Sequence, residues 1–249
     1  MLLPFTHSRH SNPMKHAAAL SLALVILSNG LTLFTYAAGV DRQLLYVPWA
    51  VVLLVAACFW ARRAAHLSWT EIGLCGVQWK RTATIGTLTG FLLAAPPLLF
   101  LIFPFLLTEP ARYREIQNLD AVGLLWRLGV ELTIATALTE ELVFRGILQA
   151  LFKRSLSAIR ALVATNFVFA LWHLAINALT LEQNTLALPL IPTAVAQTVG
   201  YLGSLIVVGI GGVILSVLRE RTNHLAGSIA AHWVSVAAMT IVLYLRAGY

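Results

Sequence analysis

Two adjacent carboxylates, Glu140 and Glu141, stand within a long apolar stretch of the sequence, and Arg145 follows four residues after the second of them. Acid before base at this spacing is the favoured order for an ion pair on a helix, so Arg145 largely neutralises Glu141. No second cation at helical spacing accompanies Glu140. Because burial disfavours the ionised form of a carboxyl group, Glu140 is either a neutral, hydrogen-bonded structural residue or a general base.

Polar side chains also share one face of each of two later apolar stretches. Residues three, four and seven apart lie on the same side of a helix. The two stripes consist of Asn166, Phe169, His173 and Asn177 in the first stretch, and of Ser228, His232 and Ser235 in the second. A polar stripe on a lipid-embedded helix must face the interior of its bundle. One histidine there is more often a packing residue than a catalytic one, but two together favour a functional site.

The ionisable residues are predicted to lie at one depth. Counted from the nearest basic residue on the predicted cytoplasmic side, Glu140 and His173 lie 13 residues deep and His232 lies 11, or roughly 20, 20 and 17 Å at ~1.5 Å per residue. Each such group costs about 2.5–3.5 kcal/mol in the membrane, so three at one level indicate a site. Glu131 would face the opposite side of an α-helix from Glu140 and is expected to pair with Arg127.

The composition shows what surrounds this site. Hydrophobic residues make up 59% of the 249 residues, charged residues only 11%, and the mean hydropathy is +0.82, whereas soluble domains carry roughly 25% charged residues. An ordinary water-soluble enzyme is excluded. The pattern predicts an all-α, polytopic transmembrane bundle that forms a single integral-membrane domain over residues 1–249. About seven spans are expected, at 16–40, 44–61, 82–107, 121–152, 158–178, 193–218 and 225–246.

The net charge of +7 does not indicate nucleic-acid binding, because the basic residues form no block with interleaved aromatic residues. Of the 17 Lys and Arg residues, eleven fall on one side of the predicted spans and four on the other. This asymmetry predicts a cytoplasmic N-terminus. We expect a multi-pass protein of the cell (inner) membrane, in contact with the lipid bilayer. Cys58 and Cys75 lack the spacing of a disulfide framework or a metal site.

Three motifs in these stretches resemble those of the CPBP family of intramembrane proteases, which includes the CAAX prenyl proteases and the bacterial Abi-like proteins. The matching residues are, in order, Glu140, Glu141 and Arg145 (EExxxR), Phe169 and His173 (FxxxH), and His232 (the start of HxxxN or HxxxD). The motifs fall on the fourth, fifth and seventh of the expected spans, and the resemblance makes residues 121–246 the expected catalytic core.

The resemblance implies an intramembrane endopeptidase that hydrolyses a peptide bond of a membrane-associated or lipid-anchored protein. Glu140 would activate a water molecule, His173 would help to hold it and carry its proton, and His232 would face the developing oxyanion. Glu141, Arg145 and Phe169 would support these residues. No covalent intermediate and no cofactor would be needed, and the partner would be a membrane protein or peptide substrate.

The third motif departs from the family pattern, because Val236 stands where the family has Asn or Asp. The resemblance assigns that side chain, with the histidine, to stabilising the oxyanion. Asn177 or Ser235 could supply the donor instead, His232 could act alone, or catalysis could be lost. Of the two replacements we favour Asn177, whose amide donates a hydrogen bond without any change of protonation.

Other functions use the same residues differently. One glutamate and two histidines could ligate zinc and leave a position open for water, although the HExxH spacing is absent. A catalytically inactive immunity or peptide-binding protein could use the polar interior as a binding cavity. A transporter could use the Glu and His side chains as a proton relay, but the sequence shows no internal repeat.

Overall fold

The computed structural model describes residues 12–40, 42–76, 78–102, 114–183 and 192–247, and these form helices and connecting turns without a strand. The helices are α1 (Pro13–Ala37), α2 (Arg42–Arg63), α3 (Trp69–Ile72), α4 (Trp79–Ile102), α5 (Arg114–Gln117), α6 (Ala121–Trp126), η1 (Arg127–Leu138), η2 (Glu141–Leu148), α7 (Gln149–Lys153), α8 (Ala158–Trp172), α9 (Leu174–Gln183), α10 (Thr193–Thr222) and α11 (Leu225–Ala247). The end of the third predicted span, after Ile102, lies outside the described residues.

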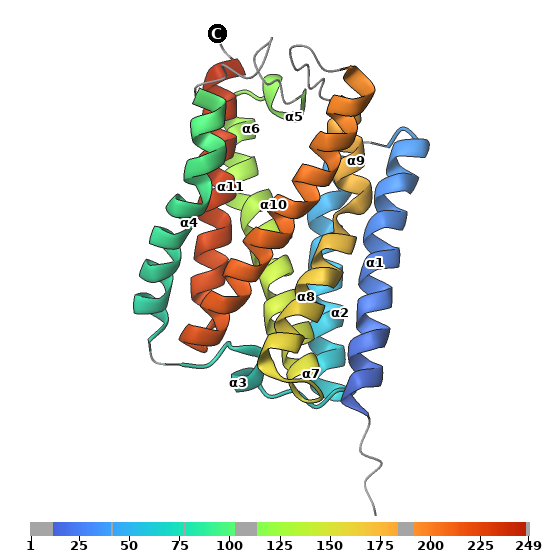
Figure 1. Ribbon diagram of the computed structural model, residues 1–249, viewed down its shortest axis with the longest axis vertical. Coiled ribbons are helices and arrows are strands. Elements are labelled where there is room, and N and C mark those ends of the chain that lie inside the picture. The colour runs from blue at the N-terminus through green and yellow to red at the C-terminus, as the bar shows by residue number, and fades with distance from the viewer. Residues whose placement is uncertain (1–11, 41, 77, 103–113, 184–191, 248–249) are drawn as a thin grey trace, which may run out of the picture.

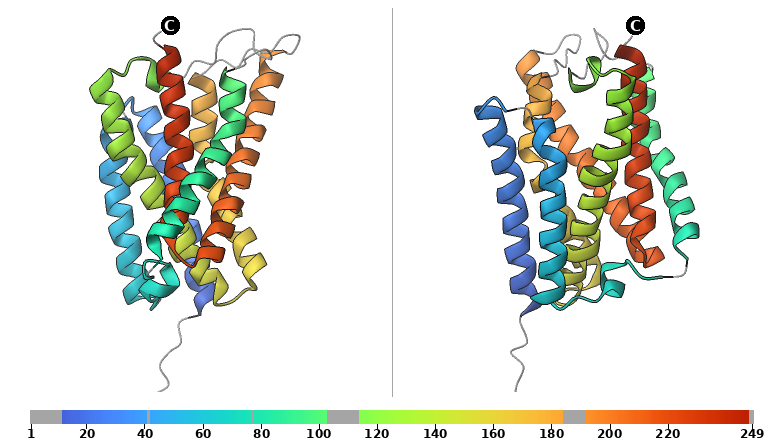
Figure 2. Two further views of the ribbon diagram at one scale, coloured as in Figure 1. Left: turned by 90° about the vertical axis from the view of Figure 1, so that its left-hand side faces the viewer. Right: turned by 180° about the vertical axis from the view of Figure 1, so that it is seen from behind.

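Six of the described helical segments are long and apolar enough to cross a membrane, and counting α8 and α9 as one bent span gives seven. The predicted all-α membrane bundle of about seven spans is therefore confirmed. The fourth span runs without interruption from Ala121 to Lys153. It lies between α1 and α2 on one side and α4 and α11 on the other, while α10 crosses the bundle diagonally (Figures 1 and 2).

The fourth span is wider than an α-helix over most of its length. Segments η1 and η2 are π-helical, a geometry that is rare at this length and is frequent at functional sites. The Thr133 and Thr139 hydroxyls donate to carbonyls five residues earlier, at 3.0 and 2.7 Å. The α-helical angle expected between Glu131 and Glu140 therefore does not apply here.

Arg127 makes the ion pair predicted with Glu131 and a second ion pair that the sequence does not predict. Its guanidinium lies 3.6 Å from the Glu131 carboxylate and 2.8 Å from that of Glu115 in α5. Because Glu115 lies outside the fourth span, these contacts fasten the short helix α5 to η1. Among the described residues, the Glu131 carboxylate pairs with Arg127 and makes no described contact with Glu140, so these charges form a separate cluster.

The fifth span is bent where the sequence predicts a continuous helix. Helix α8 ends at Trp172, α9 begins at Leu174, and their axes differ by 41°. His173 lies at the break, with φ −93° and ψ 2°. This is the sparsely populated bridge region of backbone space, in which many active-site residues are found.

Helices α4 and α11 pack with their backbones in direct contact. A Cβ atom on Gly86 would lie 2.1 Å from the Gly227 carbonyl oxygen, and one on Gly90 would lie 2.6 Å from that of Ala231. Only glycine permits such an approach, as small residues do at other membrane helix interfaces. The two helices run side by side through the bundle (Figure 2), and α11 carries His232.

Candidate active site

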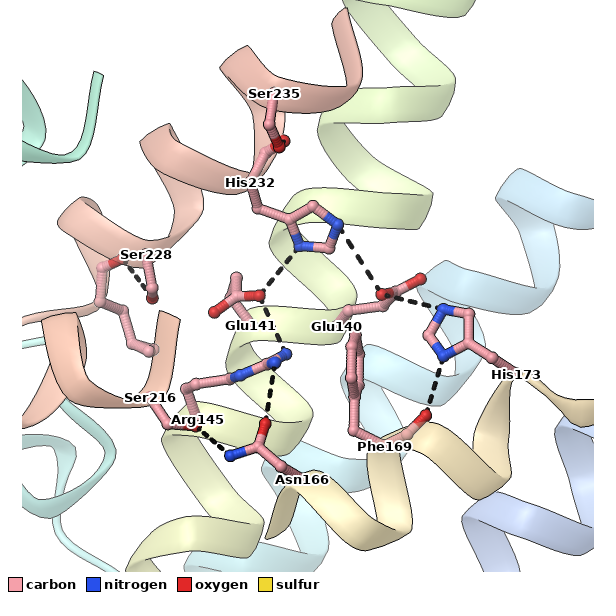
Figure 3. Close-up of polar contacts among 11 residues, drawn as sticks. Glu140, Glu141, Arg145, Asn166, Phe169, His173, Ser216, Ser228, His232 and Ser235 are labelled. Carbon is pink, nitrogen blue, oxygen red and sulfur yellow. Dashed lines mark hydrogen bonds and ion pairs between the residues drawn. The ribbon is translucent and has the colours of Figure 1, made fainter. Parts of the chain in front are cut away.

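Glu140, His173 and His232 meet in the interior of the bundle, although they come from three different helical segments (Figure 3). Oε2 of Glu140 lies 3.8 Å from Nε2 of His173 and 4.0 Å from Nε2 of His232. Glu140 is 5% exposed, and among the described residues its Oε2 atom has no direct hydrogen-bond partner. The common depth expected from the sequence thus corresponds to an actual convergence of the three side chains.

Both imidazole rings are held by their Nδ1 atoms. His173 Nδ1 lies 2.8 Å from the backbone carbonyl of Phe169, and His232 Nδ1 lies 2.9 Å from Oε1 of Glu141. A carbonyl oxygen only accepts, so Nδ1 of His173 carries the hydrogen. In the same way His232 donates to the Glu141 carboxylate. The Nε2 atoms of both rings are therefore the ones directed at Glu140.

Glu141 contacts His232 as well as Arg145, the partner that the sequence predicts. Arg145 Nη1 donates to its Oε1 at 3.1 Å, which is the expected ion pair, and both side chains are fully enclosed. The same oxygen accepts from His232. Glu141 thus does more than neutralise Arg145, because it fixes which nitrogen of His232 faces Glu140.

Arg145 is positioned by residues of α8 and α10. Its Nη2 donates to Asn166 Oδ1 at 3.4 Å, and Asn166 Nδ2 donates in turn to Ser216 Oγ at 3.0 Å (Figure 3). The Arg145 guanidinium also lies 4.0 Å from the centre of the Phe169 ring, a favourable cation–π contact. This chain of contacts links α10 to His232 through Arg145 and Glu141.

Phe169 contacts His173 through both its ring and its backbone carbonyl. Its ring packs edge-on against the imidazole with centroids 4.6 Å apart, and its carbonyl receives the Nδ1 hydrogen. Four residues of helix separate the two side chains, which explains physically why the FxxxH spacing suits this site.

The two residues expected to replace the absent Asn are engaged elsewhere. Asn177 Nδ2 donates to Ser204 of α10 at 3.1 Å, and Ser235 Oγ donates to the backbone carbonyl of His232 at 2.8 Å. The bend at His173 directs α9, and Asn177 with it, away from the line of α8. No contact that the structure describes joins either side chain to Glu140, and our preference for Asn177 over Ser235 gains no support from these positions.

Several site residues could not be identified from the sequence motifs. Ser216 and Gly212 of α10, and Ser28 and Asn29 of α1, contact the supporting residues or the break at His173. The polar pair Ser28-Asn29 within an apolar span was a visible signal of a buried polar contact, but it does not reveal the partner. Gly212 has no such signal.

Gly212 provides a test of how closely Arg145 is held. A Cβ atom there would lie 2.4 Å from Asn166 Oδ1 and 2.9 Å from Arg145 Nη2. Gly212→Ala is therefore expected to displace this pair and to lower the free energy of unfolding by about 1–3 kcal/mol, the usual cost of overpacking. Gly211→Ala is the matched control, because its Cβ would meet nothing within 4 Å. Equal denaturation midpoints for the two variants would contradict this arrangement.

The separations within the cluster are longer than those of a metal site. Ligand atoms of a tetrahedral zinc ion at ~2.0–2.1 Å are about 3.4 Å apart, whereas the separations here are 3.8 and 4.0 Å. Within the described ranges, no group of three or more His, Cys, Asp and Glu side chains could hold a metal ion as placed.

Comparison with known proteins adds one finding. Residues 122–238 match the family model described as Rce1-like, the type II CAAX prenyl endopeptidases. Neither the curated proteins nor the solved structures contain a significant match to the chain. The matched residues include Glu140, His173 and His232 and exclude α1, α2 and α4. Over residues 122–238 of this multi-pass membrane protein, the match confirms the resemblance to the CAAX proteases of the CPBP family.

Proposed function

We propose that this protein is an intramembrane endopeptidase that hydrolyses a peptide bond with a water molecule activated by Glu140. The observation that carries the proposal is the convergence of Glu140 Oε2 with the Nε2 atoms of His173 and His232, at 3.8 and 4.0 Å. These separations are too long for direct hydrogen bonds but suit a bridging water molecule. The Rce1-like match supports the same reaction class.

Donor and acceptor counting divides the roles among the three residues. With Nδ1 of His173 donating to Phe169, Nε2 of the neutral ring accepts, as does the Glu140 carboxylate. A water molecule has two hydrogens and can donate one to each of these acceptors. His232 has a carboxylate on its Nδ1 side, which stabilises the imidazolium form, so its Nε2–H can donate.

The proposed reaction then follows in two steps. Glu140 takes a proton from the water molecule while the water oxygen attacks the scissile carbonyl carbon. The carbonyl oxygen becomes an oxyanion, which His232 stabilises through its Nε2–H. Glu140 next passes the proton to the peptide nitrogen as the carbon–nitrogen bond breaks. The engagement of Asn177 and Ser235 with other partners supports His232 as the oxyanion donor without a second side chain.

The proposed substrate is a membrane-associated protein with a prenylated C-terminal CAAX sequence, in keeping with the family. The apolar surroundings of the site suit a substrate that carries a lipid anchor into the bilayer. We further propose a location in the inner cell membrane with the N-terminus in the cytoplasm, from the asymmetry of basic residues.

The direct test uses the purified full-length chain in lipid vesicles. A farnesylated peptide ending in a CAAX sequence should lose its last three residues, detected by mass spectrometry, while the same peptide without the farnesyl group should be cleaved more slowly. Absence of cleavage for both peptides, and for a panel of lipid-anchored peptides, would refute the proposed function in favour of a peptide-binding protein.

Chelation distinguishes the water mechanism from a zinc mechanism. Because Glu140 and His173 are proposed to hold the water, turnover should persist after prolonged treatment with a membrane-permeant chelator. Elemental analysis should find no stoichiometric transition metal. About one zinc per chain, with activity that returns only when zinc is added, would reverse this assignment.

A further inference from the structure

The break in the fifth span is occupied by a side chain from α1. In a continuous α-helix the Ala175 N–H donates to the Leu171 carbonyl, four residues earlier. Here Asn29 Nδ2 donates to Leu171 O at 2.9 Å, and Asn29 Oδ1 accepts from Ala175 N at 2.7 Å. The Asn29 amide therefore bonds both the donor and the acceptor that would pair with each other in a continuous helix. Insertion of a side chain into the hydrogen-bond ladder is an established cause of helix kinks.

The neighbouring backbone groups are satisfied in the same way. Ser28 Oγ donates to the Trp172 carbonyl at 3.2 Å, and the second Nδ2 hydrogen of Asn29 is donated to Val25 of its own helix at 2.8 Å. Each hydrogen-bonding group of the Asn29 amide thus has a partner. A partly buried amide with all its hydrogen bonds made is held in one position, because the loss of any one bond costs free energy.

The break determines how the His173 imidazole is bound. His173 N donates to Ala170 O at 3.1 Å, three residues earlier, rather than to the Phe169 carbonyl of a regular turn. Phe169 O instead accepts from His173 Nδ1 at 2.8 Å. The hydrogen on Nδ1 leaves Nε2 as the atom that faces Glu140. In a straight helix the Phe169 carbonyl would accept from the backbone N–H of His173, and its hydrogen bond with the imidazole Nδ1 would be weaker.

We propose that Asn29, assisted by Ser28, is a positioning residue of the active site: it keeps the helix open at His173 and thereby fixes the tautomer and direction of that imidazole. It touches neither Glu140 nor the reacting atoms. Its helix lies outside residues 122–238. The consequence for turnover rests on the proposed function, whereas the consequence for the His173 ring does not.

The test combines a spectroscopic and a kinetic measurement on the full-length chain in bilayers. Solid-state NMR of protein labelled with ¹⁵N-histidine reports which ring nitrogen is protonated, and the His173 signals are those lost in His173→Gln. We compare Asn29→Ala with Asn29→Leu, which fills the volume of the amide but makes no hydrogen bonds. Ser21→Ala is the control on the same helix, since its hydroxyl donates to the Ala17 carbonyl of α1 itself.

The parent and Ser21→Ala should show His173 protonated at Nδ1. In both Asn29 variants the Nδ1–H population should fall by half or more, and kcat should fall at least tenfold with KM changed less than twofold, because Asn29 does not contact substrate. An unchanged His173 signal in both variants overturns the proposal, even if their stability is lower. If the parent cleaves no peptide, the proposed function fails, and the NMR comparison alone decides this inference.

Discussion

Replacing Glu140 with glutamine should lower proteolysis by at least about 10²-fold, the lower end of what a general base contributes. Glutamine keeps the shape of the side chain but cannot accept the proton of the attacking water. The thermal midpoint should stay close to that of the parent, because the substitution adds no charge and Glu140 Oε2 has no direct hydrogen-bond partner among the described residues. Turnover of a lipid-anchored peptide and thermal unfolding, measured on one preparation, check both statements.

The outcome that contradicts this role is specific. A Glu140→Gln variant that keeps more than a tenth of the parent turnover would remove Glu140 as the base. Loss of activity together with a large loss of stability would instead make Glu140 a structural residue. Asn177→Ala is a useful comparison, since its amide bonds Ser204 rather than the glutamate and histidine cluster, and a small effect is expected there.

The adjacent substitution, Glu141→Gln, should by contrast destabilise the protein by about 3–5 kcal/mol. Glu141 and Arg145 are 0% exposed at their side chains and 3.1 Å apart. Removing the carboxylate leaves the guanidinium charged in an apolar interior. Chemical denaturation in detergent, with Glu140→Gln as the matched control one residue away, measures the difference.

Activity of Glu141→Gln provides a second measure. Glu141 Oε1 accepts from His232 Nδ1 at 2.9 Å, so the variant should also lose turnover at temperatures where it remains folded. Equal stability of the Glu140 and Glu141 variants would refute the division of roles between the two carboxylates. A stable Glu141→Gln with normal turnover would refute the orientation of His232 as well.

The sequence predicts the membrane bundle because apolar runs of sufficient length have few alternatives to a spanning helix. It also predicts the meeting of Glu140, His173 and His232, since ionisable side chains in lipid must face inward and residue counting gives their depth. The Glu141–Arg145 pair follows from spacing along one helix. These predictions depend only on the properties of single segments and on the physics of the bilayer, not on how the segments pack together.

The parts that sequence reasoning missed depend on contacts between segments. No Gly or Pro stands next to His173 in the sequence to mark a helix end. The break there is made by Asn29, which lies over 140 residues away in the chain. The contact of Glu141 with His232 likewise requires the packing of η2 against α11. Local propensity is a weak guide wherever a neighbouring helix supplies the hydrogen bond.

The glycine contacts of α4 with α11 set a mechanical tolerance for catalysis. Where Gly86 touches the Gly227 carbonyl, no side chain is interposed that could change rotamer and absorb a displacement. A side chain added at Gly86 would therefore have to displace α4 or α11, the helix on which His232 lies 4.0 Å from Glu140. Helix α4, which contributes no motif residue, thus bears on the position of His232 through a backbone contact that leaves no room for a larger side chain.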